Sequence, residues 1–426
     1  MNQSEARLAQ EEEFMWEKVC ARLGHAAPSL REASTSRLAE TTRFGKSAGA
    51  YAPSRDGLYY TLNKKLIEAT TSLVVRDAMS ISQLSRFMRG QTQDDNRPNK
   101  ALITSKLASA LATFPEVDTI LSIANNGVTA RLDYPLECQA SPPINHPSAS
   151  AHLNVVLKNL RKEQDAGRCI IVSYSAVRHL WGNIHFSPIG VVKKEQQELS
   201  EGGRIIHDLS WPMVDGSNSV NCRSAQSEIP KPHYTHCSDI ATRVLDLKRR
   251  FPDKDVHIMK GDVASAFRHV PLNEDSVHLF AYMIHELDVA VLELACPFGC
   301  LGKPYGYVWV DDHVNAEVNI NRRLIFVAFA LRNALVTVLG PRAINEKKFS
   351  LPSTTEEALG IVLDTKKAVV RMPVEKVTNA LTVIDACLGK PFFTKKDLQS
   401  VEGTLRSLRR ASDPDWHSCS SCTTNP

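Results

Sequence analysis

The stretch Trp309-Val310-Asp311-Asp312-His313 decides which fold this chain can adopt. Two adjacent carboxylates end a β-branched and aromatic run that begins at Tyr307. Such a run is typical of a buried strand, which would deliver Asp311 and Asp312 to one tight turn. Two like charges side by side repel each other unless a cation neutralises them. We therefore expect a divalent metal ion at this turn.

A second carboxylate at the end of a predicted strand lies upstream, in His257-Ile258-Met259-Lys260-Gly261-Asp262. The aromatic residue Phe267 follows it after a short polar and small-residue segment. An isolated Asp-Asp pair is more often a solvated turn, so the prediction depends on this further acid. If Asp262 meets Asp311 and Asp312, the three carboxylates can hold two Mg²⁺ ions, which prefer oxygen ligands.

Other motifs surround these acids. They are Arg204-Ile205-Ile206-His207-Asp208, Pro297-Phe298-Gly299, Asn345-Glu346-Lys347-Lys348-Phe349 and Ala358-Leu359-Gly360. In this order the motifs resemble those of the reverse transcriptase family, the RNA-directed DNA polymerases of retroelements. The resemblance extends from about residue 187 to 411, and the residues around Asp208 and Asp311 look closest to retrotransposons that carry a tyrosine recombinase.

The resemblance implies template-directed nucleotidyl transfer to a primer 3′-hydroxyl by a two-metal mechanism. Asp262 and Asp311 would bridge two Mg²⁺ ions, for which Mn²⁺ could substitute, and Asp312 would support them. Phe267 would lie under the sugar and exclude a 2′-hydroxyl. The other residues implied in nucleotide binding are Arg204, Lys193 or Lys194, Gly299, and Lys347 or Lys348. The implied partners are an RNA or DNA template with its primer and deoxynucleoside triphosphates.

The implied fold is α+β, a polymerase right hand that follows a mostly helical N-terminal region. Its parts are fingers, a ferredoxin-like palm and a partial thumb. The expected domains are a poorly defined helical region at 1–150, an entry helix and fingers at 151–260, a palm at 261–370, a partial helical thumb or connection at 371–411 and a disordered tail at 412–426.

Apolar periodicity predicts individual elements of this plan. Helices are expected at 63–87, 102–121, 152–166, 324–339, 374–388 and 395–410. The helix at 324–339 is almost wholly apolar, so we expect it to be buried beneath the palm sheet. A β-hairpin is expected from Ile189–Val192 to Arg204 with basic residues at its tip, and the pattern at Val289–Leu292 favours a hairpin that leads into Pro297. The charges of the last helix fit either a thumb that grips duplex phosphates or an ordinary solvated face.

Composition narrows the functional classes. With 426 residues, 43% of them hydrophobic, the chain can build two or three domains, and its net charge of +4 permits nucleic-acid binding without requiring it. The absence of an 18-residue apolar run predicts no membrane partner, and ten irregularly spaced cysteines indicate reduced thiols in an intracellular protein. His417-x-Cys419-x-x-Cys422 is better explained by a polar tail than by half of a zinc site. His207 and His269 are expected to be structural.

One junction departs from the family. Eleven residues, Cys300–Val310, separate Gly299 from Asp311, where the family inserts a long helix. Strands of like direction need a crossover of about a dozen residues or more, and Pro304 opposes a helix in this space. The alternative to an active polymerase is therefore a degenerate or mis-spliced remnant that is catalytically inactive and at most binds nucleic acid.

Overall fold

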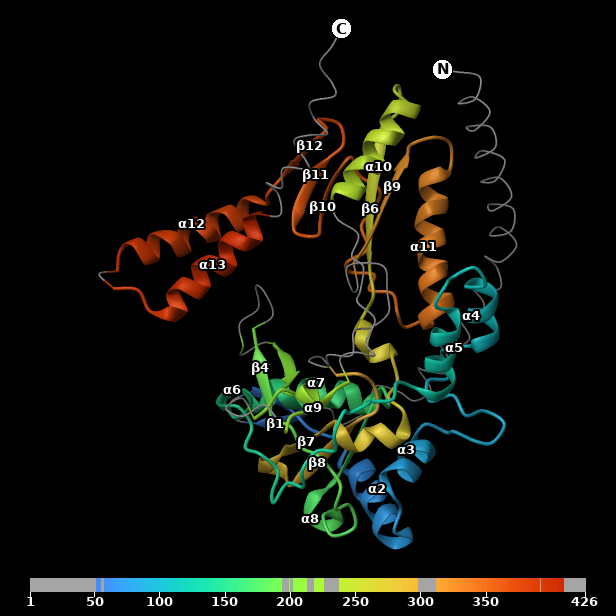
Figure 1. Ribbon diagram of the computed structural model, residues 1–426, viewed down its shortest axis with the longest axis vertical. Helices are drawn as coiled ribbons and strands as arrows, with labels where there is room; N and C mark the ends of the chain where they lie inside the picture. Colours follow the sequence, from blue (N-terminus) through green and yellow to red (C-terminus); the bar gives the residue numbers. More distant parts are fainter. Residues whose placement is uncertain are drawn as a thin grey trace.

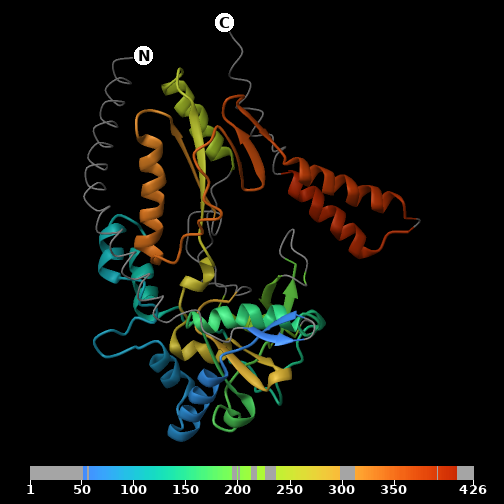
Figure 2. The same ribbon diagram turned by 180° about the vertical axis from the view of Figure 1, so that it is seen from behind.

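The computed structural model describes residues 51–54, 57–193, 199, 202–212, 218–225, 237–297, 312–390 and 392–409 (Figure 1). A lower body and an upper part are connected through the long strand β6 (Val256–Asp262), which stands vertically in Figure 1. The helical hairpin of α12 (Val374–Leu388) and α13 (Lys395–Arg409) projects sideways from the upper part, as Figure 2 shows from behind. Both helices begin as the apolar periodicity predicts.

The lower body is built on an antiparallel sheet with the strand order β3-β8-β7. Its strands are β3 (Cys169–Ser173), β7 (Ala281–Ile284) and β8 (Val289–Glu293), with the short helix η4 (His285–Leu287) between the last two. Both faces of the sheet are buried, because Ile170 and Val172 belong to one hydrophobic cluster and Cys169 and Ile171 to another. The β7–β8 pairing confirms the hairpin predicted before Pro297.

Helices cover both faces of this sheet. α7 (Leu153–Asp165) packs on one face through Val156 and Leu160, close to its predicted bounds. The other face is covered by α3 (Ile81–Met88), whose Leu84 is fully buried. The remaining elements here are β1 (Tyr51–Ser54), β2 (Gly57–Tyr60), α2 (Lys64–Asp77), α6 (Pro147–Ala151), α8 (Tyr174–Val177), α9 (Val220–Arg223), η2 (Ala266–His269) and η3 (Glu274–Leu279).

The sequence predicts one continuous helix at 63–87 and another at 102–121. Both predictions were wrong, because each of these stretches forms two helices. Ala78 adopts a left-handed conformation that ends α2, and Ser80 begins α3 with a capping box to Gln83. The second stretch forms α4 (Thr104–Ala110) and α5 (Val117–Asn126) around Pro115, which has no N–H to continue a helix.

The upper part is built around an antiparallel pair. β6 pairs with β9 (Asp312–Val318) over its whole length, from Val256 opposite Val318 to Asp262 opposite Asp312. α10 (Cys237–Arg250) places Leu247 in a core cluster with Ile258 of β6. A separate antiparallel sheet, formed by β10 (Thr355–Ala358), β11 (Ile361–Asp364) and β12 (Val369–Arg371), contacts β6 through β10.

The apolar helix α11 (Arg323–Leu339) lies beside β6 and β9 in Figure 1. It forms close to its predicted bounds, but the prediction that it is buried was wrong. In this fully described helix only Leu335 is buried, and Ile325 is 67% exposed. Most of its other residues are half-buried, and the helix contacts β6, β9 and α4. Among the described residues, no helix combines the length and apolar character needed to cross a membrane.

Candidate active site

β6 is held along both edges, which fixes the position of the acid at its end. On one edge, Asp262 is the direct register partner of Asp312 in β9. On the other edge lies the segment 343–353, where Ser353 exchanges two main-chain hydrogen bonds with Ile258, of 2.7 and 2.9 Å. Directly opposed residues of an antiparallel pair have Cα atoms about 4.5–5.5 Å apart. The main chains of the two acidic residues therefore meet at the C-terminal end of β6.

The carboxylate of Asp262 is enclosed by residues from the segment after α11. Asp262 is 2% exposed. The side-chain amide of Asn345 donates to its Oδ1 at 2.6 Å, and Nζ of Lys348 donates to its Oδ2 at 2.7 Å. The main-chain N–H of Asn345 also donates to the Asp262 carbonyl oxygen, at 3.1 Å. Each carboxylate oxygen thus has a donor, and one of the donors is a cation.

Gly261 allows this enclosing segment to approach. A Cβ atom at Gly261 would lie 2.7 Å from Cζ of Phe349 and 2.8 Å from Cδ2 of Leu331, closer than real Cβ contacts. The N–H of Phe349 donates to the carbonyl of Asn345 at 3.2 Å, so the intervening residues form a tight turn. This turn presents Asn345 and Lys348 to the same carboxylate. The close approach of the Phe349 ring to Gly261 anchors the turn against β6.

A buried ionic network anchors the segment that follows β6. Arg268 of η2 lies 3.0 Å from Glu163 of α7 and also pairs with Glu293 of β8. Burial alone would lower the pKa of Arg268, but the two glutamates raise it above its ordinary value. Burial raises the pKa of Glu293, and Arg268 opposes that effect only in part. The half-buried Phe267 packs against the main core cluster beside this network.

The two histidines near the motifs are structural, as expected. His207 is buried, and its Nε2 lies 3.2 Å from the carbonyl oxygen of Ala281. Nε2 of His269 lies 2.8 Å from the carbonyl oxygen of Ala264. Burial lowers the pKa of His207 to about 3 and lowers the pKa of His269 below its ordinary value. Both rings are therefore neutral near pH 7 and serve as hydrogen-bond donors to main-chain carbonyls.

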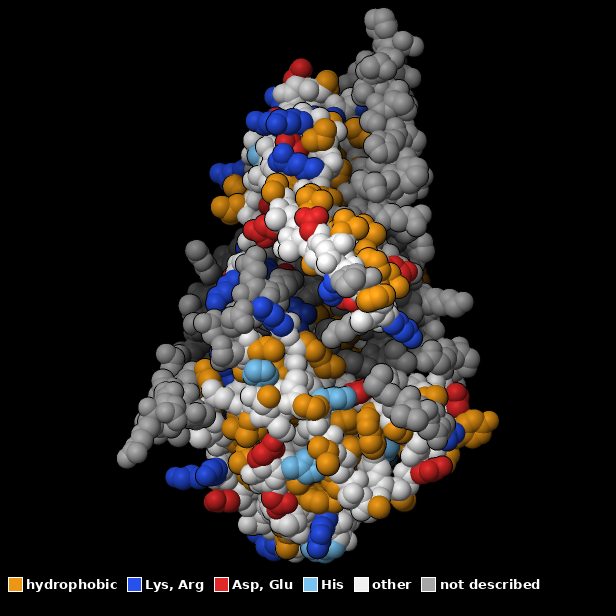
Figure 3. Space-filling model, turned by 90° about the vertical axis from the view of Figure 1, so that its left-hand side faces the viewer, with side chains coloured by type: hydrophobic (Ala, Val, Ile, Leu, Met, Phe, Trp, Pro, Cys, Tyr) orange, Lys and Arg blue, Asp and Glu red, His pale blue; other side chains and the backbone are white. Residues whose placement is uncertain are grey.

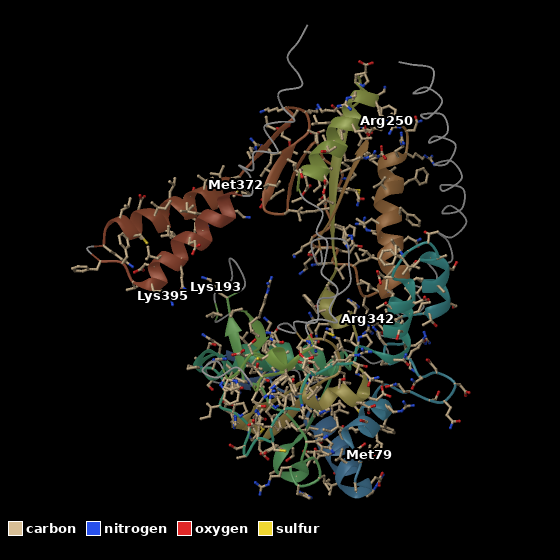
Figure 4. The ribbon with its side chains drawn as sticks, in the orientation of Figure 1. Met79, Lys193, Arg250, Arg342, Met372 and Lys395 are labelled. Atoms are coloured by element: carbon tan, nitrogen blue, oxygen red, sulfur yellow. The ribbon has the colours of Figure 1, made fainter. Side chains whose placement is uncertain are left out.

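The predicted nucleotide-binding residues lie on different elements. The predicted hairpin forms from β4 (Ile189–Val192) and β5 (Arg204–His207), with Arg204 exposed opposite Val192. Lys193 follows β4 at the upper end of this hairpin, on the side of the body nearest the projecting helices (Figure 4). Lys347 is exposed. Lys194, Gly299, Asp311 and the side chain of Asp312 lie outside the described residues, as do residues 300–310 and the His417/Cys419/Cys422 group.

The structure therefore brings together Asp262, Asn345, Lys348 and the main chain of Asp312. The sequence predicted Asp262 and named both lysines, but preferred Lys347. It did not identify Asn345 as a partner of Asp262. The spacing of Asn345 and Lys348, three residues apart before an aromatic anchor, was the available signal.

The described residues on the two sides of the short junction are each held by main-chain contacts. On the entering side, the N–H of Cys296 donates to the carbonyl of Val270 at 2.9 Å, just beyond η2. On the leaving side, Asp312 lies opposite Asp262. Because β9 runs antiparallel to β6, the expectation that the two strands run in the same direction and need a helical crossover does not hold for this pair.

Asp262 supplies one buried carboxylate at this position, and its two oxygens accept hydrogen bonds from Asn345 and Lys348. Carboxylate oxygens are the ligands that Mg²⁺ and Mn²⁺ prefer. Lys348 is the more exposed partner of this ion pair, because its side chain is 54% exposed whereas that of Asp262 is 4% exposed. Within the described residues, no three His, Cys, Asp or Glu side chains gather into a metal-binding group. A metal site here would therefore require acids beyond those residues, of which Asp311 is the predicted one.

No family model and no curated protein matches this chain. Among solved structures it is similar to foamy viral protease-reverse transcriptases. One of them, in complex with an RNA/DNA hybrid, has 14% identity and a TM-score of 0.42 over 78% of this chain and 39% of that chain. Another, in complex with dsDNA, has 14% identity and a TM-score of 0.41 over 76% of this chain and 67% of that chain. This chain thus spans about two fifths of the first structure and two thirds of the second.

Proposed function

We propose that this chain is a reverse transcriptase-like protein of a retroelement, which transfers deoxynucleotides to a primer 3′-hydroxyl on an RNA or DNA template. The observation that carries the proposal is the register of β6 and β9, in which Asp262 lies directly opposite Asp312. This register joins the two acidic motifs found in the sequence, although many residues separate them along the chain. In this proposal the upper part is the palm, the lower body contributes the fingers, and α12 and α13 form a partial thumb.

In the proposed reaction, Asp262 and Asp311 bind two Mg²⁺ or Mn²⁺ ions, supported by Asp312. Such ions would make the primer hydroxyl a better nucleophile and neutralise charge on the α-phosphate and the leaving pyrophosphate. Asn345 orients the Asp262 carboxylate by its hydrogen bond to Oδ1. Arg204, Lys193 and Lys194 bind the triphosphate, because guanidinium and ammonium groups donate charge-assisted hydrogen bonds to phosphate oxygens.

Phe267 and Gly299 complete the proposed nucleotide site. Phe267 closes the space beside a 2′-hydroxyl and so selects deoxynucleotides, and its partial burial against the core would hold the ring in place. Gly299 lets the main chain approach the template or the base. The lysine of the later motif that contacts the catalytic acid is Lys348, which makes it a stronger candidate than Lys347 to meet the leaving group.

A primer-extension assay tests this function. The full chain is incubated with a labelled primer on an RNA template or a DNA template, deoxynucleoside triphosphates, and Mg²⁺ or Mn²⁺. We expect extension that disappears with chelator and falls about a hundredfold or more in Asp311→Asn and Asp262→Asn, as when a transition-state stabiliser is removed. Asp253→Asn makes the same chemical change at an exposed position outside the site and should retain full extension.

The alternative is the inactive remnant, and the short Cys300–Val310 junction is the observation that favours it. A remnant would bind nucleic acid without extending primers under any metal condition. Folded protein that binds the primer–template duplex, yet gives no extension with either ion, would support the remnant and contradict the polymerase. Equal extension by the wild type and Asp262→Asn would contradict the proposed site itself.

A further inference from the structure

In the ion pair between Lys348 and Asp262, the lysine side chain is largely exposed and the aspartate side chain is buried. Asp262 stands at the end of a strand held on both edges, and its side chain is 4% exposed. Lys348 comes from a turn, and its side chain is 54% exposed. The ammonium can therefore withdraw into solvent, whereas the carboxylate cannot follow it.

The other donor to Asp262 is not removable in the same way. Asn345 is tied to Asp262 twice, by its side-chain amide at 2.6 Å and by its main-chain N–H at 3.1 Å. A cation that binds Oδ2 therefore meets Lys348 as its competitor. The ammonium lies 2.7 Å from that oxygen, which is the distance of a direct charge-assisted hydrogen bond.

We propose that Lys348 is an internal counter-ion that occupies Oδ2 of Asp262 in the metal-free protein and must leave when a divalent ion binds. The inference rests on the proposed function, since it takes Asp262 as a metal ligand. Burying a carboxylate without a partner is costly, and a second acidic residue lies opposite in the register. The lysine would therefore stabilise the Asp262 carboxylate when no metal is bound, and it would also weaken the affinity of that carboxylate for the metal.

This exchange predicts opposite effects of removing Lys348 on stability and on metal affinity. Without the ammonium, the metal-free protein contains a buried carboxylate with one neutral donor, so its thermal midpoint should fall. The divalent ion no longer has to displace a cation, so it should bind more tightly. A lysine with a purely structural role would lower the thermal midpoint without raising the affinity for the metal.

Mn²⁺ titration followed by electron paramagnetic resonance on the full chain tests the exchange. Lys348→Gln should bind Mn²⁺ about tenfold more tightly than the wild type or more, and Lys348→Arg, which keeps a cation, should bind as weakly as the wild type. Lys347→Gln is the matched control, because it removes the same charge from the adjacent, exposed residue. Its affinity for Mn²⁺ should stay close to that of the wild type.

Thermal unfolding of the same proteins gives a second readout. The midpoint of Lys348→Gln should lie below that of the wild type without metal, and the difference should close as Mn²⁺ is added, because a ligand that binds only the folded state stabilises it.

Two failures are distinguishable. Equal Mn²⁺ affinities of the wild type and Lys348→Gln, both lost in Asp262→Asn, would overturn the counter-ion role and leave the proposed function intact. If the wild type and Lys348→Gln both bind no Mn²⁺, or if Asp262→Asn binds it as well as they do, the metal site itself is contradicted. The proposed function would then fall together with the inference.

Discussion

The ring of Phe349 lies against the main chain of Gly261, directly beside the residue that carries the buried carboxylate. A methyl group at Gly261 would lie 2.7 Å from Cζ of Phe349, so Gly261→Ala should push the turn at 345–349 away from β6. We expect a loss of about 1–3 kcal/mol in the free energy of unfolding, which is typical of an overpacked interior. Urea denaturation measures it.

The matched control for this substitution is Gly182→Ala. A Cβ at Gly182 has no atom within 4 Å, and the residue is exposed. Its free energy of unfolding should stay within about 0.5 kcal/mol of the wild type, as for ordinary surface changes. Equal stabilities of the two variants would show that the Phe349 ring moves aside freely and does not anchor the turn.

Arg268 should be the most sensitive charged residue among the described ion pairs. Arg268→Gln leaves Glu293 buried without its cation, and breaking a buried pair from one side costs about 3–5 kcal/mol. The double variant Arg268→Gln/Glu293→Gln should recover part of this loss, because the unpaired charge is gone. Chemical denaturation of both variants measures the difference.

The exposed ion pair Arg76–Asp77 provides the comparison, because its side chains are 72% and 43% exposed. Arg76→Gln should unfold at the same denaturant concentration as the wild type. If the double variant were no more stable than Arg268→Gln, the lost energy would come from the packing of the arginine stem and not from the charge of Glu293.

Buried histidines predict the acid dependence of stability. Burial lowers the pKa of His207 to about 3 and that of His185 to about 4, below their ordinary value of 6.5. Below about pH 6.5 the unfolded chain binds protons that the folded chain does not, so stability should fall as the pH falls from 6.5 towards 4. Each pKa unit corresponds to about 1.4 kcal/mol. Urea midpoints between pH 7.5 and 5 test this.

His207→Gln separates this contribution from that of other acid-sensitive groups. Glutamine can still donate to the Ala281 carbonyl but does not titrate, so the variant should lose less stability between pH 7.5 and 5 than the wild type does. The control is the exposed His179→Gln, whose pH dependence should match the wild type. Parallel pH profiles for all three proteins would contradict the prediction.

Arg204 provides a test of the proposed nucleotide site that does not involve the acids. Arg204→Gln should raise the KM for the deoxynucleoside triphosphate about tenfold, because a hydrogen bond to a charged group contributes about 1.5–3 kcal/mol. Primer-extension kinetics at varied nucleotide concentration measure it. The exposed Arg371 of β12 offers the same change to glutamine outside the fingers hairpin, and its KM should not change. An equal rise in both variants would indicate a general charge effect.

Elements with strong local signals could be predicted from the sequence. α7, α12 and α13 follow from apolar periodicity, and the β4–β5 hairpin from two short apolar runs around a polar turn. The division between α2 and α3 was also readable, because Ser80 and Gln83 have the spacing of a capping box. The prediction of one continuous helix over 63–87 overlooked this pair.

Features that depend on distant residues could not be predicted. β3 pairs with β8, more than a hundred residues later, and nothing local in Cys169–Ser173 indicates that partner. The incomplete burial of α11 was missed because an apolar sequence shows which side chains a helix could bury, and it does not show how far the surrounding elements cover them. Hydrophobic side chains are also exposed on the projecting helices, where Figure 3 shows them on the surface, and Leu388 is 73% and Leu398 59% exposed.

At the candidate site the acidic residues could be predicted from the sequence, whereas the hydrogen-bond partners of Asp262 are known only from the structure. Residue types and order were enough to single out Asp262 and the Asp311-Asp312 pair. The choice between two adjacent lysines was not readable, because it depends on how the turn at 345–349 closes on Gly261. The contact of Lys348 with Asp262 is therefore a result of packing rather than of sequence pattern.

The β3–β8 pairing also constrains how this protein can emerge from a ribosome. β3 has β8 as its sheet partner, and roughly 120 residues must still be translated before that strand exists. At about 5–20 residues per second this delay is roughly 6–24 s. During this delay β3 lacks its partner strand, and the apolar residues of α7 lack the completed sheet on which they pack. A nascent chain stalled between these strands should therefore bind hydrophobic-binding chaperones, and it should release them once Glu293 has cleared the exit tunnel.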